Sequence, residues 1–380
     1  MQRHTLGFAA AALLAGCSAS TADLEPIAWQ KVPGTGPGGA LLGLGTPGSF
    51  DERGNFTISA FKDGDTYKLY YGGADTNGKC AGINRAHWRI GLAQSSNGLD
   101  FTRVPGSEKG GAVLDIGAAG NFDDYLTYRP FVLKDGSLYR MWYNGSTKPF
   151  NCPNGTLADN RRIGYAESSD GVHFTRKYDG DGPGGSVLPI GPAGAIDAQQ
   201  VGYVWVIKDT SEYKMFYSAN DAQNFWRVAL AVSSDARHWT KVPGKQTGGS
   251  ILDLGKKVVL DGGLTQDAFD VACAYQPSVV KERDQLDRMW YRGCQSSGAF
   301  GGPSRGVIGY AESNDGRVWV KVPQPGPLGE AVSQGAAGQF DSGGLTTPSV
   351  FLDGNTWKMY YAGFDTTGQF FTGLAQAPRR

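Results

Sequence analysis

Aspartates recur at one position of a repeated sequence pattern, and they are the first candidates for chemistry. Each follows an aromatic residue or an isoleucine near the start of a repeat. Hydrolysis of a glycosidic bond needs two carboxyl groups, one that donates a proton and one that serves as base or nucleophile. A residue present in every repeat also suits a structural role, either as a turn acceptor or as a partner of Arg89, Arg162 or Arg227. The catalytic candidates of this kind are Asp51, Asp123, Asp197, Asp270 and Asp341.

Two further carboxylates interrupt the repeat. Glu52 directly follows Asp51, and Asp124 directly follows Asp123. Two adjacent carboxylates that face one cavity push their pKa values apart, as a catalytic acid and base require. A solvated acidic turn would have the same sequence. Glu52 and Asp124 are therefore added to the catalytic candidates, with the solvated turn as the alternative.

Groups that could hold a ligand lie near the same positions. Arg129 stands where the other repeats have neutral residues, and a guanidinium binds an anionic sugar or a carboxylate through paired N–H groups. Pairing with Asp123 or Asp124 is the alternative for this arginine. Tyrosines suit sugar rings through their faces and hydroxyls, although core packing uses the same residues. The remaining candidates for substrate binding are Tyr125, Tyr128, Tyr203, Tyr275, Gln276, Asp75 and Asp221.

The elements that must position these residues belong to a fivefold repeat with a spacing of about 70 residues. Its most regular part is an apolar strand rich in aromatic residues, at 68–73, 140–145, 214–219, 288–293 and 358–363. Each repeat contains four apolar runs, but the last repeat ends after its third run. The missing fourth run occurs at the other end of the chain, at 29–33. This pattern predicts an all-β, five-bladed β-propeller of four-stranded blades, whose last blade is closed by the N-terminal strand.

The repeat Phe-Asp … Pro-Ser-Val … Tyr-Lys-Met-Trp-Tyr-x-Gly … Ile-Gly-Tyr-Ala-Glu-Ser-x-Asp-Gly … Trp-x-Lys-Val-Pro resembles the five-bladed propellers of glycoside hydrolase families 43, 32 and 130. The resemblance covers nearly the whole chain after its N-terminal segment, and it implies a ligand in the central funnel. Relatives in families 32 and 43 commonly have a catalytic aspartate just before the proline of the innermost strand. The matching residues here are Thr57, Arg129, Tyr203, Gln276 and Thr347, none of which is a carboxylate.

The pattern favours a carbohydrate-active protein. The first hypothesis is a glycoside hydrolase that acts on a polysaccharide or oligosaccharide in the funnel by a two-carboxylate mechanism. A non-catalytic carbohydrate-binding propeller and a structural or protein-interaction propeller are the alternatives. We expect no required cofactor and assign no metal ligands, with bound calcium left open.

The N-terminal segment predicts export. Residues 1–16 combine a basic start with an apolar run that is too short to span a bilayer. The sequence Leu-Ala-Gly-Cys at 14–17 resembles the bacterial lipobox, which implies cleavage before Cys17 and lipidation of its thiol. An ordinary signal peptide is the alternative. We expect residues 17–26 to tether a propeller of residues 27–380 to the outer membrane, on its periplasmic or surface face.

Charge and cysteine content complete the expectations. The chain has 36 basic and 36 acidic residues, so its formal net charge is zero and nucleic acid is not an expected partner. We expect a monomer with a glycan ligand. Four cysteines remain besides Cys17, and an even number in an exported chain suggests disulfides. Their places in the repeat favour the pairs Cys80–Cys152 and Cys273–Cys294.

Overall fold

The computed structural model describes residues 26–80, 83–148, 161–259, 265–283, 286–295 and 306–379. Within these ranges the chain is all β apart from four 3₁₀ turns of three residues each. No helix in the same ranges is long and apolar enough to cross a membrane. The expected signal segment and Cys17 lie outside the described residues.

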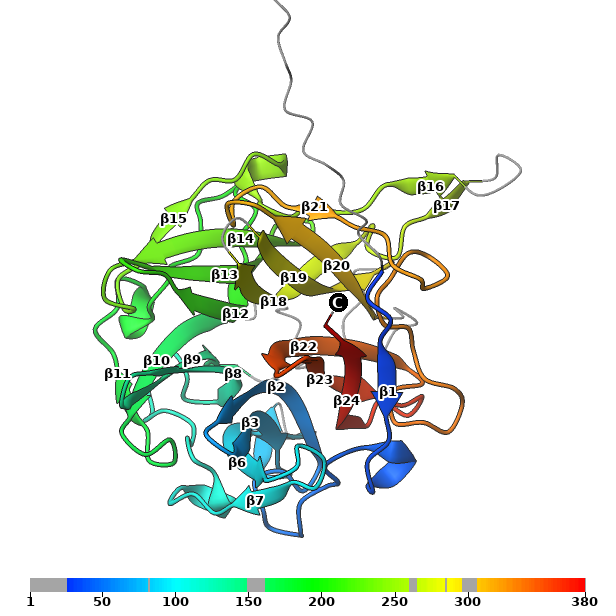
Figure 1. Ribbon diagram of the computed structural model, residues 1–380. Helices are drawn as coiled ribbons and strands as arrows, with labels where there is room; N and C mark the ends of the chain where they lie inside the picture. The colour runs from blue at the N-terminus through cyan, green and yellow to red at the C-terminus, as the bar shows by residue number, and fades with distance from the viewer. Residues whose placement is uncertain are drawn as a thin grey trace, which may run out of the picture.

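The strands form antiparallel units of four, arranged around a common centre (Figure 1). The first unit contains β2 (Gly54–Asp63), β3 (Thr66–Ala74), β6 (Trp88–Ser95) and β7 (Thr102–Val104). The second contains β8 (Leu126–Asp135), β9 (Leu138–Ser146), β10 (Arg162–Ser168) and β11 (Thr175–Lys177). The third contains β12 (Gln200–Lys208), β13 (Tyr213–Asn220), β14 (Trp226–Ser233) and β15 (Thr240–Val242).

The fourth unit contains β18 (Cys273–Arg283), β19 (Leu286–Cys294), β20 (Val307–Ser313) and β21 (Val320–Lys321). The fifth contains β22 (Gly344–Asp353), β23 (Thr356–Phe364), β24 (Phe370–Pro378) and, from the other end of the chain, β1 (Gln30–Val32). Two small hairpins lie outside these units: β4 (Gly78–Cys80) with β5 (Ile83–Arg85), and β16 (Lys257–Val259) with β17 (Thr265–Asp267).

The first strands of the units line the centre and close a ring. In order, β2 contacts β8, β8 contacts β12, β12 contacts β18, β18 contacts β22, and β22 contacts β2. At the outer edge of the fifth unit β1 pairs with β24, with Lys31 opposite Ala375. The predicted all-β propeller is therefore confirmed, and the N-terminal strand completes its last blade as the repeat pattern predicts. Closure of this kind covers a strand edge that would otherwise be free.

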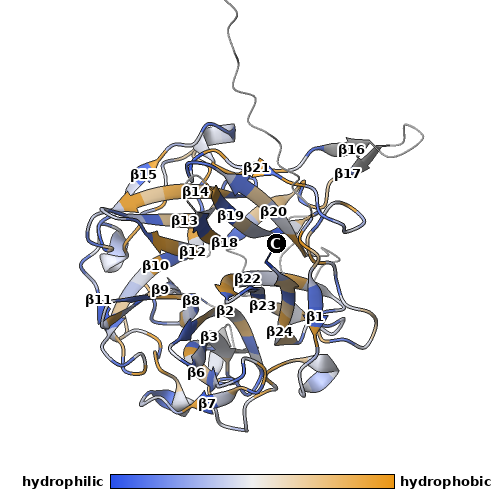
Figure 2. Cartoon of the chain, in the orientation of Figure 1, coloured by the Kyte–Doolittle hydropathy of each residue, from blue (hydrophilic) through white to orange (hydrophobic). Residues whose placement is uncertain are grey.

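The hydrophobic core lies between the blades, because each second strand carries adjacent large side chains that face opposite ways. In β9, Trp142 and Tyr143 are 0% and 1% exposed. Trp142 belongs to the same buried cluster as Tyr217 of the third blade, whereas Tyr143 belongs to the cluster that contains Tyr70 and Ile90 of the first blade. Successive side chains of a strand alternate in direction, so one strand binds both neighbouring blades. Figure 2 shows hydrophobic segments within strands such as β14, next to hydrophilic ones.

Some of these aromatic side chains also reach the hairpin turn of the next blade. Tyr70 Oη donates to the carbonyl of Gly171 at 2.7 Å, and Trp142 Nε1 donates to that of Ala236 at 3.1 Å. Trp290 has the matching place in the fourth blade. In the fifth blade, however, β24 and β1 come from opposite ends of the chain, so no hairpin turn joins them. Trp290 Nε1 has no hydrogen-bond partner among the described residues.

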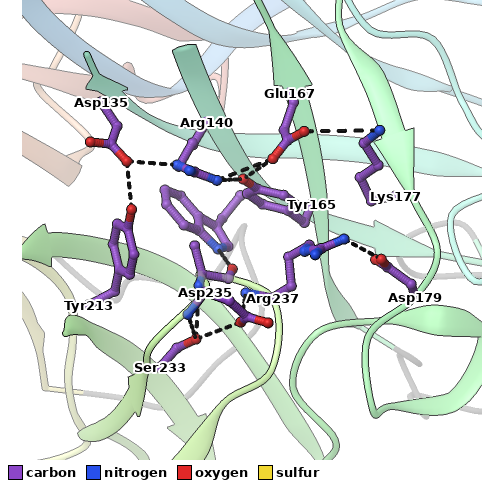
Figure 3. A network of polar contacts seen from close by, with 12 residues as sticks. Asp135, Arg140, Tyr165, Glu167, Lys177, Asp179, Tyr213, Ser233, Asp235 and Arg237 are labelled. Atoms are coloured by element: carbon purple, nitrogen blue, oxygen red, sulfur yellow. Dashed lines mark hydrogen bonds and ion pairs between the residues drawn. The ribbon is translucent and has the colours of Figure 1, made fainter. Parts of the chain in front are cut away.

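Ion pairs join consecutive blades at the turns between first and second strands. Asp135 of the second blade accepts hydrogen bonds from Tyr213 of the third blade at 2.5 Å and from Arg140 (Figure 3). It also accepts one from Lys208 of the third blade at 2.5 Å. Exposed pairs of this kind contribute about 0–1 kcal/mol each, so the interblade core dominates the stability. A pair crosses every blade boundary: Asp63–Lys134, Asp135–Lys208, Asp209–Lys281, Glu282–Arg379 and Asp353–Lys62.

One of the two predicted disulfides is confirmed. Cys273 and Cys294 lie opposite each other on β18 and β19 and are joined through their sulfur atoms. Both are buried in a cluster with Tyr203 and Tyr275. The other prediction, Cys80–Cys152, involves Cys152, which lies outside the described residues.

Candidate functional site

The first strand of every blade is interrupted by a β-bulge at the same repeat position. In four blades a residue of the bulge is left-handed, with φ of 57° at Arg129, 46° at Tyr203, 56° at Gln276 and 45° at Thr347. A residue other than glycine in this region costs about 1–3 kcal/mol, and bulges commonly redirect a side chain. The strained residues are four of the five that match the catalytic aspartate in the family resemblance.

The four left-handed residues line one axial pocket. Its volume is about 30 Å³, measured over the positions that the centre of a water molecule can take. Such a volume is enough for ordered water or for a polar group of a ligand. None of the described lining residues is a carboxylate. The rest of the wall consists of Ile58, Pro130, Phe131, Val204, Trp205, Pro277 and Pro348.

Each of the four residues presents polar atoms that have no hydrogen-bond partner in the described part of the chain. They are Nε, Nη1 and Nη2 of Arg129, Oη of Tyr203, Nε2 of Gln276 and Oγ1 of Thr347. The four side chains are buried, with exposed fractions of 3%, 5%, 2% and 7% in that order. A buried donor without a partner costs about 1–3 kcal/mol, and more if it is charged. Four such residues at one place therefore indicate a site for something that accepts hydrogen bonds.

The guanidinium of Arg129 lies between tyrosine rings. Its Cζ atom is 3.3 Å from the centroid of the Tyr203 ring and 4.6 Å from that of Tyr128. Burial lowers the pKa of Arg129, although Tyr128 and Tyr203 oppose this effect. Burial also raises the pKa of Tyr203 to about 12, against the opposing influence of Arg129. The predicted alternative for Arg129, an ion pair with Asp123 or Asp124, is wrong because its nitrogens have no such partner.

Two more arginines lie near Tyr203, and neither was a candidate from sequence. Arg292 Nη1 donates to Tyr275 Oη at 2.7 Å, and Arg161 Cζ lies 5.9 Å from the Trp226 ring. Both arginines act to lower the pKa of Tyr203. Arg292 occupies a position where the other repeats have Gly, Asn, Ser or Ala, and this departure is a signal that could have identified it.

The five repeat aspartates do not line the axial pocket. Asp123, which is 0% exposed, accepts hydrogen bonds from Tyr143 Oη at 2.9 Å and Arg176 Nε at 2.8 Å. Tyr143 belongs to the second strand of the same blade and Arg176 to its outermost strand. The cluster recurs in every blade, as Asp51–Tyr71–Arg103, Asp197–Tyr217–Lys241, Asp270–Tyr291–Lys321 and Asp341–Tyr361–Lys31.

The expected pairing of repeat aspartates with third-strand arginines is wrong where the partners are described. Arg89 binds Asp75, and Arg227 Nη1 binds Asp221 at 2.7 Å. The fourth strand, not the third, supplies the cation for each repeat aspartate. Asp75 and Asp221, which were candidates for substrate binding, directly follow their second strands. Both are held by these arginines, and neither lines the axial pocket.

Neither acidic pair faces one cavity. Asp51 is buried in its blade cluster, whereas Glu52 accepts a hydrogen bond from the N–H of Gly48 at 2.8 Å. That hydrogen bond lowers the pKa of Glu52. Asp124 likewise accepts from the N–H of Gly120 at 2.9 Å. Glu52 and Asp124 thus serve as turn acceptors, which matches the solvated-turn alternative.

Tyr125 is not part of the pocket wall either. Its ring contacts His87 edge to face, with the centroids 4.7 Å apart. Burial lowers the pKa of His87. No group of three or more His, Cys, Asp or Glu side chains that could hold a metal ion occurs in the described ranges.

Comparison with known proteins supports the fold. The chain is 29% identical over 251 residues to "Uncharacterized protein Rv1502" of Mycobacterium tuberculosis, which covers 66% of this chain and 70% of that protein. No family model matches the sequence. A thermostable family-43 glycoside hydrolase matches with a TM-score of 0.56 and 17% identity, over 84% of this chain and 88% of that one.

A β-1,2-mannobiose phosphorylase from Listeria innocua matches with a TM-score of 0.58 and 12% identity, over 86% of this chain and 89% of that one. At such identities the likeness concerns the fold and not the chemistry. The chain therefore has the propeller fold of these glycoside hydrolases and phosphorylases, as the resemblance in its repeat implies.

Proposed function

We propose that this chain binds a glycan in its central funnel and does not cleave it with the carboxylates of the repeat. A fold shared with glycoside hydrolases and a phosphorylase supports a carbohydrate ligand. The observation that carries the non-hydrolytic part is the axial pocket, whose described lining contains polar and cationic groups but no carboxylate. Hydrolysis by two carboxylates needs an acid and a base or nucleophile flanking the bond that breaks.

The bonding of the repeat aspartates supports the same conclusion. Oδ2 of Asp123 accepts from Tyr143 and Arg176, and Oδ1 accepts from Tyr178 Oη at 3.1 Å. A general acid or base must come within hydrogen-bond distance of the reacting group. Oxygens that are buried and occupied by donors of their own blade do not meet this condition.

The test compares binding with sugar release. The full chain carrying Cys17→Ser is incubated with plant and bacterial polysaccharides and with aryl glycosides. We expect saturable binding of at least one polysaccharide in affinity electrophoresis and no release of reducing sugar. Thr347→Val should weaken that binding, and Thr356→Val, which lies at the distant β22–β23 turn, is the matched control. Sugar release that is lost in Asp123→Asn, Asp124→Asn or Glu52→Gln would instead support the hydrolase.

We also propose that the chain is exported and held at the outer membrane through lipidated Cys17. The support is the sequence of residues 1–17, with its basic start, short apolar run and lipobox-like end. Fractionation of expressing cells should place the wild-type chain in the outer membrane and Cys17→Ser in the soluble periplasm. A Cys17→Ser chain that stays with the membrane would contradict this proposal.

A further inference from the structure

We propose that the axial pocket is an oxyanion site that takes the carboxylate of an acidic sugar residue. The identity of the ligand as a sugar rests on the proposed function. The presence of an oxyanion site is argued independently, from hydrogen-bond donors, charge and backbone strain at four equivalent positions.

The pocket offers donors. The guanidinium of Arg129 carries five N–H groups and no acceptor, and none of its nitrogens has a partner among the described residues. Gln276 is oriented by its own contacts, since its Oε1 accepts from the Thr347 N–H at 2.8 Å and from Thr346 Oγ1 at 2.5 Å. The unpartnered half of this amide is therefore its NH₂ group. The hydroxyls of Tyr203 and Thr347 can each donate one more hydrogen bond.

Stacking on aromatic rings does not satisfy these donors. Tyr203 and Tyr128 contact the guanidinium within cation–π distance of their ring centroids. Such contacts stabilise a cation through the ring faces, whereas the N–H bonds of a guanidinium lie in its own plane. The rings thus hold Arg129 in place and leave its hydrogen-bonding edges for a ligand. A carboxylate matches those edges, because it accepts two parallel hydrogen bonds from one arginine.

The guanidinium of Arg129 also brings a positive charge into the pocket wall. None of its nitrogens has a partner among the described residues. Asp123, which was a possible counter-ion from sequence, is paired with Arg176 instead. A buried cation without a counter-ion is strongly unfavourable, so an anion from solution would supply the missing charge.

The wall of the pocket indicates what carries the anion. Trp205 is half-buried in the same wall and packs against Phe131, with ring centroids 4.7 Å apart. An aromatic surface beside an anion site suits a sugar ring that bears a carboxylate. The ligand class is therefore a glycan with uronic acid residues.

The experiment uses the full chain with Cys17→Ser and three probes: galacturonate oligomers, neutral galactose oligomers of equal length, and inorganic phosphate. Calorimetry should give at least tenfold tighter binding of the acidic oligomer, with an affinity that falls as salt is added. Arg129→Met should weaken this binding by about 10- to 100-fold, since charged hydrogen bonds are lost. Thr347→Val should weaken it by about threefold to tenfold. Exposed Arg53, changed to Met, is the control and should have no effect.

Melting temperatures separate a ligand site from a structural arginine. Without ligand, Arg129→Met should melt at the same temperature as the parent chain or higher, because a buried unpaired charge is removed. The galacturonate-induced rise in melting temperature should disappear in this variant. If Arg129→Met does not fold, Thr347→Val gives the same comparison.

The outcomes distinguish the two proposals. Acidic and neutral oligomers that bind equally, with no effect of Arg129→Met, would overturn the oxyanion site and leave glycan binding intact. Stabilisation by phosphate that depends on Arg129, without binding of any glycan, would support the oxyanion site and overturn the proposed function. No response to galacturonate or phosphate would overturn the oxyanion site.

Discussion

Lys31 Nζ lies 2.6 Å from Asp341 Oδ2, although 310 residues separate them in the chain. Lys31 is on β1, and Asp341 precedes β22 in the same blade. In the other four blades the same cluster forms within about 55 consecutive residues. The fifth copy therefore joins the N-terminal strand to the C-terminal repeat.

Removal of Lys31 should destabilise the fold. Asp341 is 1% exposed, and Lys31→Met would leave this buried carboxylate without its cation. We expect a loss of about 2–3 kcal/mol in the free energy of unfolding, measured by urea denaturation. Lys62→Met, which breaks the exposed interblade pair with Asp353, is the control and should cost much less stability. Equal losses in the two variants would argue against the role of Lys31 in closure.

Asp123→Asn separates a structural role from a catalytic one. Because Asp123 is buried against Tyr143 and Arg176, the variant should lose about 2–3 kcal/mol of stability. Glycan affinity of the folded protein should stay within about twofold of the parent value. Exposed Asp65, changed to Asn, should alter neither quantity. If the variant loses glycan affinity while its stability is unchanged, Asp123 would have a functional role instead of a structural one.

The interblade contact of Asp135 should make stability depend on acid pH. Burial would raise the pKa of Asp135, but hydrogen bonds from Lys208, Tyr213 and Arg140 outweigh it and lower the pKa to about 2. An unfolded aspartate has a pKa of about 3.9. Since the folded pKa is the lower one, this contribution is complete above about pH 4 and is lost as the pH falls towards 2.

Asp135→Asn should therefore be less stable than the parent chain at pH 7, and most of this difference should be lost as the pH falls from about 4 to 2. Urea midpoints measured between pH 2 and 7 test this expectation, with Asp65→Asn as the variant that should follow the parent curve. A stability difference as large at pH 2 as at pH 7 would show that Asp135 acts by a means other than its charge.

The Cys273–Cys294 disulfide should stabilise both the fold and the axial pocket. It closes a 21-residue separation, and removal of a disulfide of this size costs about 2–4 kcal/mol. The same buried cluster contains Tyr203, so Cys273→Ala with Cys294→Ala should also weaken ligand binding. The single variant Cys273→Ala should lose as much stability as the double variant, because either change breaks the bond. A double variant as stable as the parent chain would contradict this role.

The architecture could be predicted because its signals are periodic. Aromatic strands repeat along the sequence, and the run at 29–33 replaces the one missing at the end; β1 then pairs with β24 as expected. The place of Cys273 and Cys294 within one repeat similarly predicted their bond. Such inferences use only the order of strands, which the sequence pattern specifies.

The site was harder to predict. It depends on the direction of side chains and on which of them have no hydrogen-bond partner among the described residues. Arg89 and Arg103 are both near Asp51 in sequence, but only the fourth-strand residue, Arg103, reaches it. The bulge that turns Arg129 into a left-handed conformation leaves little trace in sequence apart from the following proline. That Arg129 has no hydrogen-bond partner among the described residues depends on side chains of neighbouring blades, which no local pattern specifies.

No hairpin joins the third and fourth strands of the fifth blade, so β1 and β24 are held together by noncovalent contacts alone. Every other blade is continuous in the chain, so tension along the backbone passes through covalent bonds from strand to strand. Here the outer strand β1 is held by three residue pairs with β24 and by the Lys31–Asp341 ion pair. A force applied to the chain before Gln30 would therefore peel β1 away first. The ion pair between Lys31 and Asp341 would resist this separation of β1 from β24.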